Sequence, residues 1–282
     1  MTSPTNEPAV FVDLNLARRL EAAEGHGCAG FVETRARLVP DSGAAWTETA
    51  GAYVVFDTID SPVTQTFGLG VLGHVTSADL DRIENFYRGY GAPVFHEVSP
   101  LAESSLMTLL NERGYEPFEF TSVMYRPTQG GLALPAPRNP NIQVRQPGAD
   151  ERELWAQTAA RGWVEATELA DSILDLMRIG AHRSDAICVL AMLKGRPIAT
   201  GLMSMHEGVA VLAGASTIPE GRKQGAQLAL LSTRLRLAAK HGCDLAMMCA
   251  QPGSASQRNA ERQGFRIAYT RIKWRLGKGT FG

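Results

Sequence analysis

The sequence predicts an α/β (α+β) protein of two similar halves, in each of which helices alternate with strands on a mixed sheet. Three observations support this prediction. A segment rich in glycine and proline divides the 282 residues near their middle, both halves close with the same order of elements, and both contain an amphipathic helix that ends at a glycine. Helix periodicity that alternates with short apolar runs is typical of α/β architectures.

The dividing segment reads PTQGGLALPAPRNPN from Pro127 to Asn141. Neither a helix nor the interior of a sheet accommodates such a density of proline and glycine. We therefore predict a first domain at residues 1–130, a linker at 131–141 and a second domain at 142–282. The similar lengths of the two domains raise the question of duplication.

The ends of the two halves favour duplication. Each has a helix that ends in Glu-Arg, then a glycine and an aromatic residue (Gly114-Tyr115 and Gly264-Phe265), then a strand. Glycine supplies the left-handed residue that ends a helix, and the aromatic residue packs back under it. Two unrelated α/β domains could share this order, but the agreement of several elements favours a copy.

In the second half, hydrophobic periodicity predicts each element in turn. Strands are expected at 142–145 and 244–250 and at the end of the chain, and a hairpin is expected over 186–206 around Gly195. Helices are expected to about 160, at about 167–179, at 225–241 and at 254–263. A further strand at 209–216 contains Gly214, which indicates a bulge or a close approach of two backbones.

The composition narrows the class of protein. Apolar residues make up 44% and charged residues 20%, and the formal net charge is −1, which disfavours a nucleic-acid-binding protein. The four cysteines have no metal-binding spacing, so no metal site is expected. The start of the chain does not resemble a signal peptide, and no apolar run reaches the roughly 20 residues of a membrane span. We therefore expect a cytoplasmic protein that makes no contact with a membrane.

The segment from Thr217 to Leu228 contains the clearest chemical signal. It joins an apolar strand to an amphipathic helix through Gly221 and Gly225, with Arg222 and Lys223 between them. The start of a helix leaves N–H groups unpaired and has a partial positive charge, so this segment favours a phosphate or a pyrophosphate. The alternative is an ordinary turn with two solvated cations. No nucleotide-binding P-loop or dinucleotide-binding pattern is present.

The run Pro219-Glu220-Gly221-Arg222-Lys223-Gln224-Gly225-Ala226-Gln227 resembles the Arg/Gln-x-x-Gly-x-Gly/Ala motif of the GCN5-related N-acetyltransferases. The resemblance covers about residues 141–277 and implies two domains of that fold, each a mixed, mostly antiparallel sheet flanked by helices. It implies acetyl-CoA as co-substrate and no metal. The implied contacts with coenzyme A are made by Ala215, Ser216, Thr217, Arg222, Lys223, Gln224, Gly225, Ala226, Gln227, Leu228 and Ser256.

The first half resembles the same fold more loosely. At the position of the loop it reads FGLGVLGHVTSAD, without the Arg-x-x-Gly-x-Gly/Ala pattern, and the following helix begins with Asp79 and Asp81. Carboxylates at the start of a helix repel a phosphate. We predict that this half is a degenerate copy that binds no coenzyme A.

The implied reaction is transfer of an acetyl group to an amine, which must first lose a proton to a base. Candidate bases are Glu165, Glu168 and Glu207, with His206 beside the last of them, although each could be a solvated loop residue. A backbone N–H near Thr217 or Ile218 could receive the developing negative charge on oxygen. The expected acceptor is an amine of a small molecule or of a protein, and the chain is expected to be a monomer or a homodimer.

Two other classes of function stay open. Ala260 stands where many members of the family have the tyrosine that protonates the departing thiolate. The chain could therefore be a regulatory or sensor protein that binds acyl-CoA with little or no turnover. It could also be a tandem scaffold whose first half contacts another protein.

Overall fold

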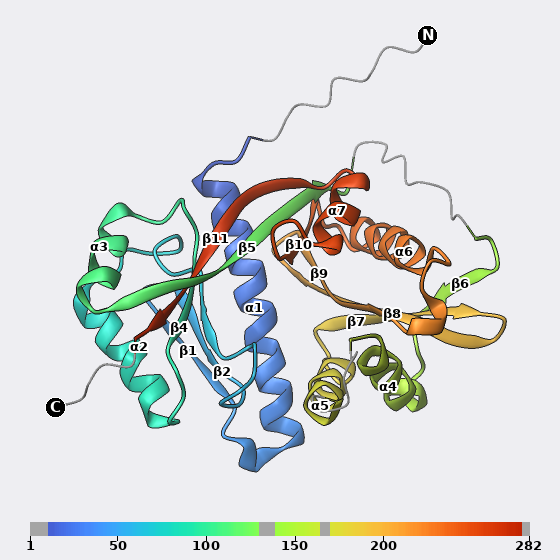
Figure 1. The fold of residues 1–282 in the computed structure, drawn as a ribbon, viewed down its shortest axis with the longest axis horizontal. Helices are drawn as coiled ribbons and strands as arrows, with labels where there is room; N and C mark the ends of the chain where they lie inside the picture. The colour runs from blue at the N-terminus through green and yellow to red at the C-terminus, as the bar shows by residue number, and fades with distance from the viewer. Residues whose placement is uncertain (1–10, 130–138, 164–169, 278–282) are drawn as a thin grey trace, which may run out of the picture.

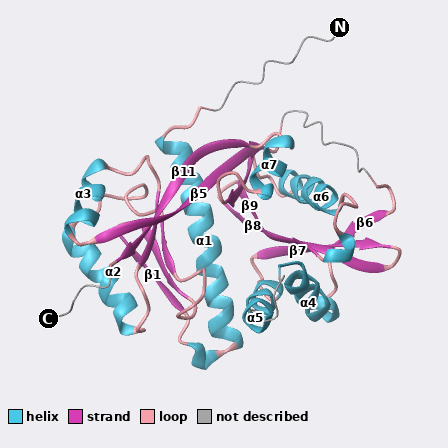
Figure 2. Cartoon of the chain, viewed as in Figure 1, coloured by secondary structure: helices cyan, strands magenta, loops and turns pink. Residues whose placement is uncertain are grey.

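The computed structural model describes residues 11–129, 139–163 and 170–277. Within them, one continuous sheet has the strand order β1-β2-β3-β4-β11-β5-β10-β9-β8-β7-β6. Its pairs are antiparallel except for β3 with β4 and β9 with β10. The predicted mixed, mostly antiparallel sheet flanked by helices is confirmed, and the two halves share it (Figures 1 and 2).

The strands are β1 (Ala45–Thr49), β2 (Ala52–Phe56), β3 (Gln65–Phe67), β4 (Phe95–Val98), β5 (Tyr115–Pro127), β6 (Ile142–Arg145), β7 (Ala186–Leu193), β8 (Arg196–His206), β9 (Val209–Thr217), β10 (Leu245–Ala250) and β11 (Arg266–Leu276). The helices are α1 (Leu14–Leu38), α2 (Ser77–Gly89), α3 (Ser104–Glu112), α4 (Arg152–Trp163), α5 (Ala170–Ala181), α6 (Ala226–Lys240) and α7 (Ala255–Arg262). The boundaries predicted for the second half agree with these to within about three residues.

The two halves exchange their closing strands. β5, which ends the first half, pairs with β10 of the second, and β11, which ends the second half, pairs with β4 of the first. β5 and β11 also pair with each other over most of their length. On each side of this central pair, the strands of one half follow in descending order towards the edge of the sheet, and each side contains one parallel pair. This symmetry supports duplication. Because the closing strands are exchanged, the two halves do not form separate sheets.

Helix α1 was not predicted. It begins after Asp13, whose side chain accepts a hydrogen bond from the N–H of Leu16. Three glycines on the helix face neighbouring side chains closely: a Cβ at Gly25 would overlap the Tyr53 ring, and one at Gly30 would lie 2.5 Å from the Asp185 carboxylate. These glycines weaken the helical pattern in the sequence, but they let α1 lie against strands of both halves (Figure 1).

The helices of the second half cover both faces of its strands. α6 and α7 lie on one face, and α4 and α5 lie on the other (Figure 1). On the α6 face, Leu231 and Leu235 pack with Leu212 of β9, while on the opposite face Trp155 of α4 packs with Leu202 of β8. No helix in the described ranges is long and apolar enough to cross a membrane.

Candidate functional site

The two parallel strands of the second half diverge in the middle of the sheet. Within the described residues, β10 pairs with β9 at Leu245–Met247 and Val209–Val211, and beyond that point it pairs with β5 alone. β9 continues to Thr217 with β8 on its other side. The side of residues 212–217 that faces away from β8 is here called the open edge of β9. No strand of the described residues lies beside it. Ala213 on this stretch is exposed although it lies within an eleven-stranded sheet.

A β-bulge shapes the open edge. Between the pairs Leu202–Ala213 and Thr200–Ser216, Gly201 of β8 lies opposite both Gly214 and Ala215 of β9. Gly214 has a φ of +58°, the left-handed conformation that glycine adopts at such bulges. The predicted irregularity at Gly214 is thus confirmed.

The bulge reverses the alternation of side chains. Leu212 points towards α6, whereas the Ser216 hydroxyl donates to the Ala159 carbonyl of α4 at 2.9 Å. Thr217 then turns back, and its hydroxyl accepts a hydrogen bond from the Gln227 side chain of α6 at 2.8 Å. Because the Ser216 side chain is buried and engaged, this stretch can offer a ligand mainly its backbone. Gln227 ties the end of β9 to the start of α6.

The loop before α6 has an unusual backbone. Lys223 has a φ of +63° and Gly225 a φ of +90°, two left-handed residues in close succession. Turns of this kind direct successive N–H groups towards one side and form sites for anions. Gly225 is the N-cap of α6 and provides no side-chain cap, and the Ala229 N–H is the donor to the Gly225 carbonyl. The amides of Ala226, Gln227 and Leu228 come before that bond, so they remain available to a ligand.

Apart from Ser256, the predicted cofactor residues follow one another along the chain, from the end of β9 through the loop into the first turn of α6. Ala215, Ser216 and Thr217 end β9, while Arg222, Lys223 and Gln224 are exposed in the loop. Ser256 is exposed in the first turn of α7, a helix whose cap is Ser254. Its place beside a cofactor stays a prediction.

Of the three predicted catalytic residues, the structure describes only Glu207. Glu165 and Glu168 lie outside the described residues. Glu207 is exposed in the β8–β9 turn, roughly 20 Å along the strand from Gly214 at about 3.3 Å per residue. His206 beside it stacks on His26 of α1 with ring centroids 4.2 Å apart, and burial lowers the pKa of His206.

The structure also places the Ile218 N–H and the Ala260 side chain, both of which entered the predicted chemistry. The Ile218 N–H, expected near a developing negative charge, donates to the Ile198 carbonyl at 3.0 Å, so that expectation is wrong for Ile218. Ala260 is 1% exposed and packs with Phe265 in the core below α7. No hydroxyl therefore stands at this position.

A cluster of charged side chains that the sequence did not reveal lies beside the divergence of β9 and β10. Arg271 of β11 is buried between Glu21 and Glu24 of α1 and Glu97 of β4, at 3.3, 2.7 and 3.1 Å. Cys249 of β10, two residues beyond the last pair with β9, donates to the Glu24 carboxylate at 3.4 Å. Glu24 and Cys249 are 225 positions apart in the sequence, and Glu21 and Arg271 are 250 apart. No local sequence pattern could therefore have indicated the cluster.

Carboxyl side chains outnumber basic side chains in this cluster. The basic side chains are Arg271 and Lys273. Lys273 forms ion pairs with Glu97 at 3.7 Å and with Glu119 at 3.5 Å. Burial raises the pKa of Glu21, against the effect of Arg271, and the negative charges of Glu24 and Glu97 raise it further. Glu24 is the most accessible of the three carboxylates: its side chain is 17% exposed, compared with 1% for Glu21 and 5% for Glu97.

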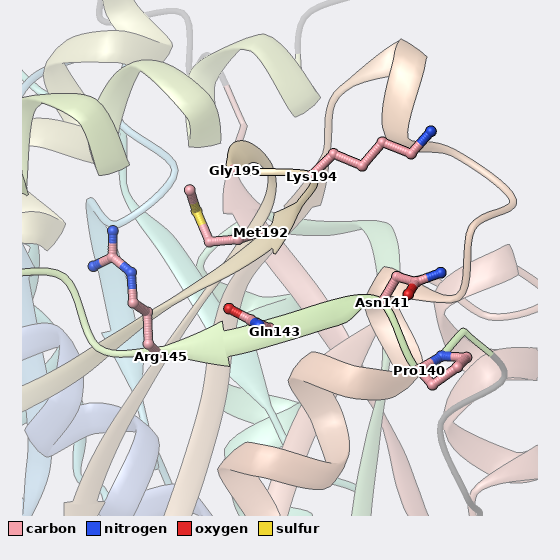
Figure 3. Close-up of a pocket in the computed structure, with 7 residues that line it drawn as sticks. All are labelled: Pro140, Asn141, Gln143, Arg145, Met192, Lys194 and Gly195. Atoms are coloured by element: carbon pink, nitrogen blue, oxygen red, sulfur yellow. The ribbon is translucent and has the colours of Figure 1, made fainter.

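Two surface pockets lie at the outer edge of the sheet. One of about 480 Å³ is formed by β6 and the turn of the β7–β8 hairpin, with Gln143, Arg145 and Met192 along its wall (Figure 3). The other, of about 760 Å³, reaches from that turn to Gln224 of the loop, and the ion pair of Arg161 with Glu220 lies on its rim. Neither includes the open edge of β9.

The corresponding region of the first half is closed. The parallel strands β3 and β4 meet at one pair, Thr66 with His96, and the Gly70 carbonyl then accepts a hydrogen bond from the Glu103 N–H at 3.4 Å. The start of α2 is capped, because Asp79 accepts from the Thr76 N–H and the Thr76 hydroxyl accepts from the Asp79 N–H. The hydrogen bonds from Thr76 lower the pKa of Asp79. Two amides at the start of α2, those of Thr76 and Asp79, are therefore occupied by the chain itself.

Comparison with solved structures identifies the fold. A GCN5-related N-acetyltransferase from Kribbella flavida superposes with a TM-score of 0.65 at 16% identity, covering 97% of this chain and 98% of that one. Another from Sphaerobacter thermophilus gives 0.57 at 17% identity, covering 92% and 90%. A tandem protein of the same family from the clavulanic acid biosynthesis pathway gives 0.54 at 12% identity, covering 80% and 78%.

The chain therefore has the fold of the GCN5-related N-acetyltransferases, and the likeness extends over both of its halves. No protein-family model matches the sequence, and no curated protein matches it. The resemblance inferred from the second half is confirmed at the level of the fold.

Proposed function

We propose that this chain is an N-acyltransferase that transfers an acetyl group from acetyl-CoA to an amine of a small molecule or of a protein. The observation that supports this proposal most strongly is the continuity of the open edge of β9 with the uncapped start of α6. An unpaired strand edge can bind an extended, amide-containing arm, and an uncapped helix start can bind a pyrophosphate. Coenzyme A contains both groups.

The residues of the second half fit these two groups. The backbone of Ala215, Ser216 and Thr217 would pair with the pantetheine arm, and the amides of Lys223 to Leu228 would hold the pyrophosphate. Arg222 and Lys223 add positive charge beside them. The acyl donor supplies the activated carbonyl, and these residues hold it in place. Holding an amine and a thioester together accounts for much of the acceleration that such a site needs.

Glu24 is the base that the structure supports best. It comes from the first half, is partly exposed, and contacts Cys249 on the strand that borders the opening between β9 and β10. The cluster around Glu24 has more carboxyl groups than basic groups, so it attracts a protonated amine. The amine can then lose its proton to Glu24 directly or through water. On this proposal the first half no longer binds a cofactor but supplies the acceptor side of the site.

Coenzyme A and a panel of amines test the proposal. Coenzyme A is expected to raise the midpoint of thermal unfolding, and acetyl-CoA with an accepted amine is expected to release free thiol. Failure of coenzyme A to protect the protein at saturating concentration would refute the cofactor site. Glu24→Gln should lower kcat by about 100-fold, the scale of a lost general base. Glu33→Gln is the matched control, because Glu33 is exposed on the same helix and accepts a hydrogen bond from Trp46 at 2.8 Å.

A second candidate function is binding of acyl-CoA as a regulatory signal, with little or no turnover. The buried Ala260 favours it, because no phenol at that position could protonate a departing thiolate. Thermal protection by coenzyme A without thiol release for any amine would support this alternative over transfer.

A further inference from the structure

Arg234 of α6 is a buried cation without a carboxylate partner among the described residues. It is 2% exposed, and burial lowers its pKa to about 10. Arg271 of β11 is equally buried, but three carboxylates surround it. Removing an unpaired charge from water is unfavourable, so a leucine or methionine would be the less costly occupant of this position. What Arg234 contacts must offset that cost.

The contacts of Arg234 are two backbone carbonyls at the bulge. Its Nη1 donates to the Leu202 carbonyl of β8 and to the Ala213 carbonyl of β9, both at 3.2 Å. These two residues face each other across the strands at the last regular pair before the bulge. Where an extra residue disrupts the ladder, neighbouring backbone groups need other partners. Arg234 supplies a donor to both strands.

The strands leave room for this guanidinium. A Cβ at Gly201, opposite the bulge, would lie 3.1 Å from both Cζ and Nε of Arg234. The Nε has no hydrogen-bond partner in the described structure, so the group is held by Nη1 and by packing. Gly201 thus leaves the space that the Arg234 guanidinium fills on the α6 side of the sheet, opposite the bulge.

We propose that Arg234 is a positioning residue for acyl transfer, holding the Gly214–Ala215 bulge and so the direction of the backbone groups on the open edge of β9. The inference rests on the proposed function, because the open edge is where the acyl donor would lie. The bulge decides that Ser216 faces α4 and Thr217 faces α6. Without its support, the edge could return to regular alternation, and every residue after Gly214 would change face.

The test compares Arg234→Met with Arg236→Met. The first removes the donors and the buried charge at similar length, so the fold is expected to survive. The second makes the same change at an exposed position of the same helix. Arg234→Met should lower kcat by about 100-fold, the effect of a small misplacement of reacting groups, with the KM for acetyl-CoA changed by less than about threefold. Arg234→Lys should restore part of kcat, and Arg236→Met should leave both constants unchanged.

Amide hydrogen exchange without any ligand separates this inference from the proposed function. Arg234→Met should speed exchange at Ala213–Ser216 by about tenfold or more, and Arg236→Met should not. Unchanged exchange, or a wild-type kcat in Arg234→Met, would overturn the positioning role. If the wild type binds coenzyme A but acylates no amine, the proposed function fails, and the exchange result still decides whether Arg234 holds the bulge. If Arg234→Met does not fold, Gly201→Ala gives the same decision, because its Cβ would lie 3.1 Å from the guanidinium carbon and force that group to shift.

Discussion

Leu228→Asp would give helix α6 of the second half the capping carboxylate that Asp79 provides to helix α2 of the first half. Leu228 lies in the first turn of α6, partly buried, at the position that Asp79 occupies in α2. In α2 that carboxylate accepts a hydrogen bond from the N–H of the N-cap residue, Thr76, at 2.8 Å. A carboxylate at 228 would approach the corresponding amides of α6 and compete with a pyrophosphate for them. We expect it to weaken the binding of coenzyme A.

The expected magnitude follows from Coulomb's law. One carboxylate at roughly 6 Å from two negative charges, at an effective dielectric constant of about 60, costs about 2 kcal/mol, or about 30-fold in Kd. The fold should survive, because a carboxylate in the first turn stabilises a helix by about 0.3–1 kcal/mol and offsets part of the lost burial.

Calorimetric titration with coenzyme A measures this effect, and Leu228→Asn is the control of similar shape without charge. The loss should shrink as salt is added, since it is electrostatic. An equal loss in Leu228→Asn, or a loss that salt does not change, would refute the reasoning, because the effect would then come from packing.

Three further predictions concern the fold and the first half. Asp79→Ala removes the capping box of α2 and should lower the free energy of unfolding by about 1 kcal/mol, while calorimetry should still find one coenzyme A per chain; two per chain would show that the cap alone closes the first site. Glu21→Gln should change how stability depends on pH. Because the native pKa of Glu21 is raised above its ordinary 4.5, the native protein binds the extra proton, and wild-type stability falls as pH rises from that value to the native pKa. The variant should lose less stability over this range in urea unfolding, and parallel curves would contradict the account. Gly25→Ala should destabilise the protein by about 1–3 kcal/mol, because the methyl group overlaps the Tyr53 ring. Gly89→Ala, at the end of α2 with nothing within 4 Å, should instead be neutral or stabilise it by about 0.5 kcal/mol, and similar losses in both variants would refute the packing argument.

The second half could be predicted closely because its signals are local. Glycines at 195, 242 and 264 end or join regular elements with strong apolar periodicity between them. The loop before α6 was found for the same reason: Gly221 and Gly225 separate a strand from a helix within a few residues. Glycines placed between periodic segments predict where a chain turns.

The charged cluster around Glu24, proposed as the acceptor side, could not be predicted because it depends on contacts between distant segments. Helix α1 has glycines at 25, 27 and 30, which lower helix propensity and hide its pattern, although each faces a neighbouring side chain. Glu24 meets Arg271 only because the closing strands of the two halves are exchanged. Which neighbour a strand chooses is a property of the whole sheet, and the sequence of β11 contains no sign that β4 is its partner.

Amide hydrogen exchange of the wild-type protein with and without coenzyme A tests the central claim most directly. The account predicts slower exchange in two connected stretches of the second half, 212–217 of the open edge and 223–228 of the loop and first turn of α6, with no change over 67–80 of the first half. Slower exchange over 67–80, or no change in either half at saturating coenzyme A, would contradict it.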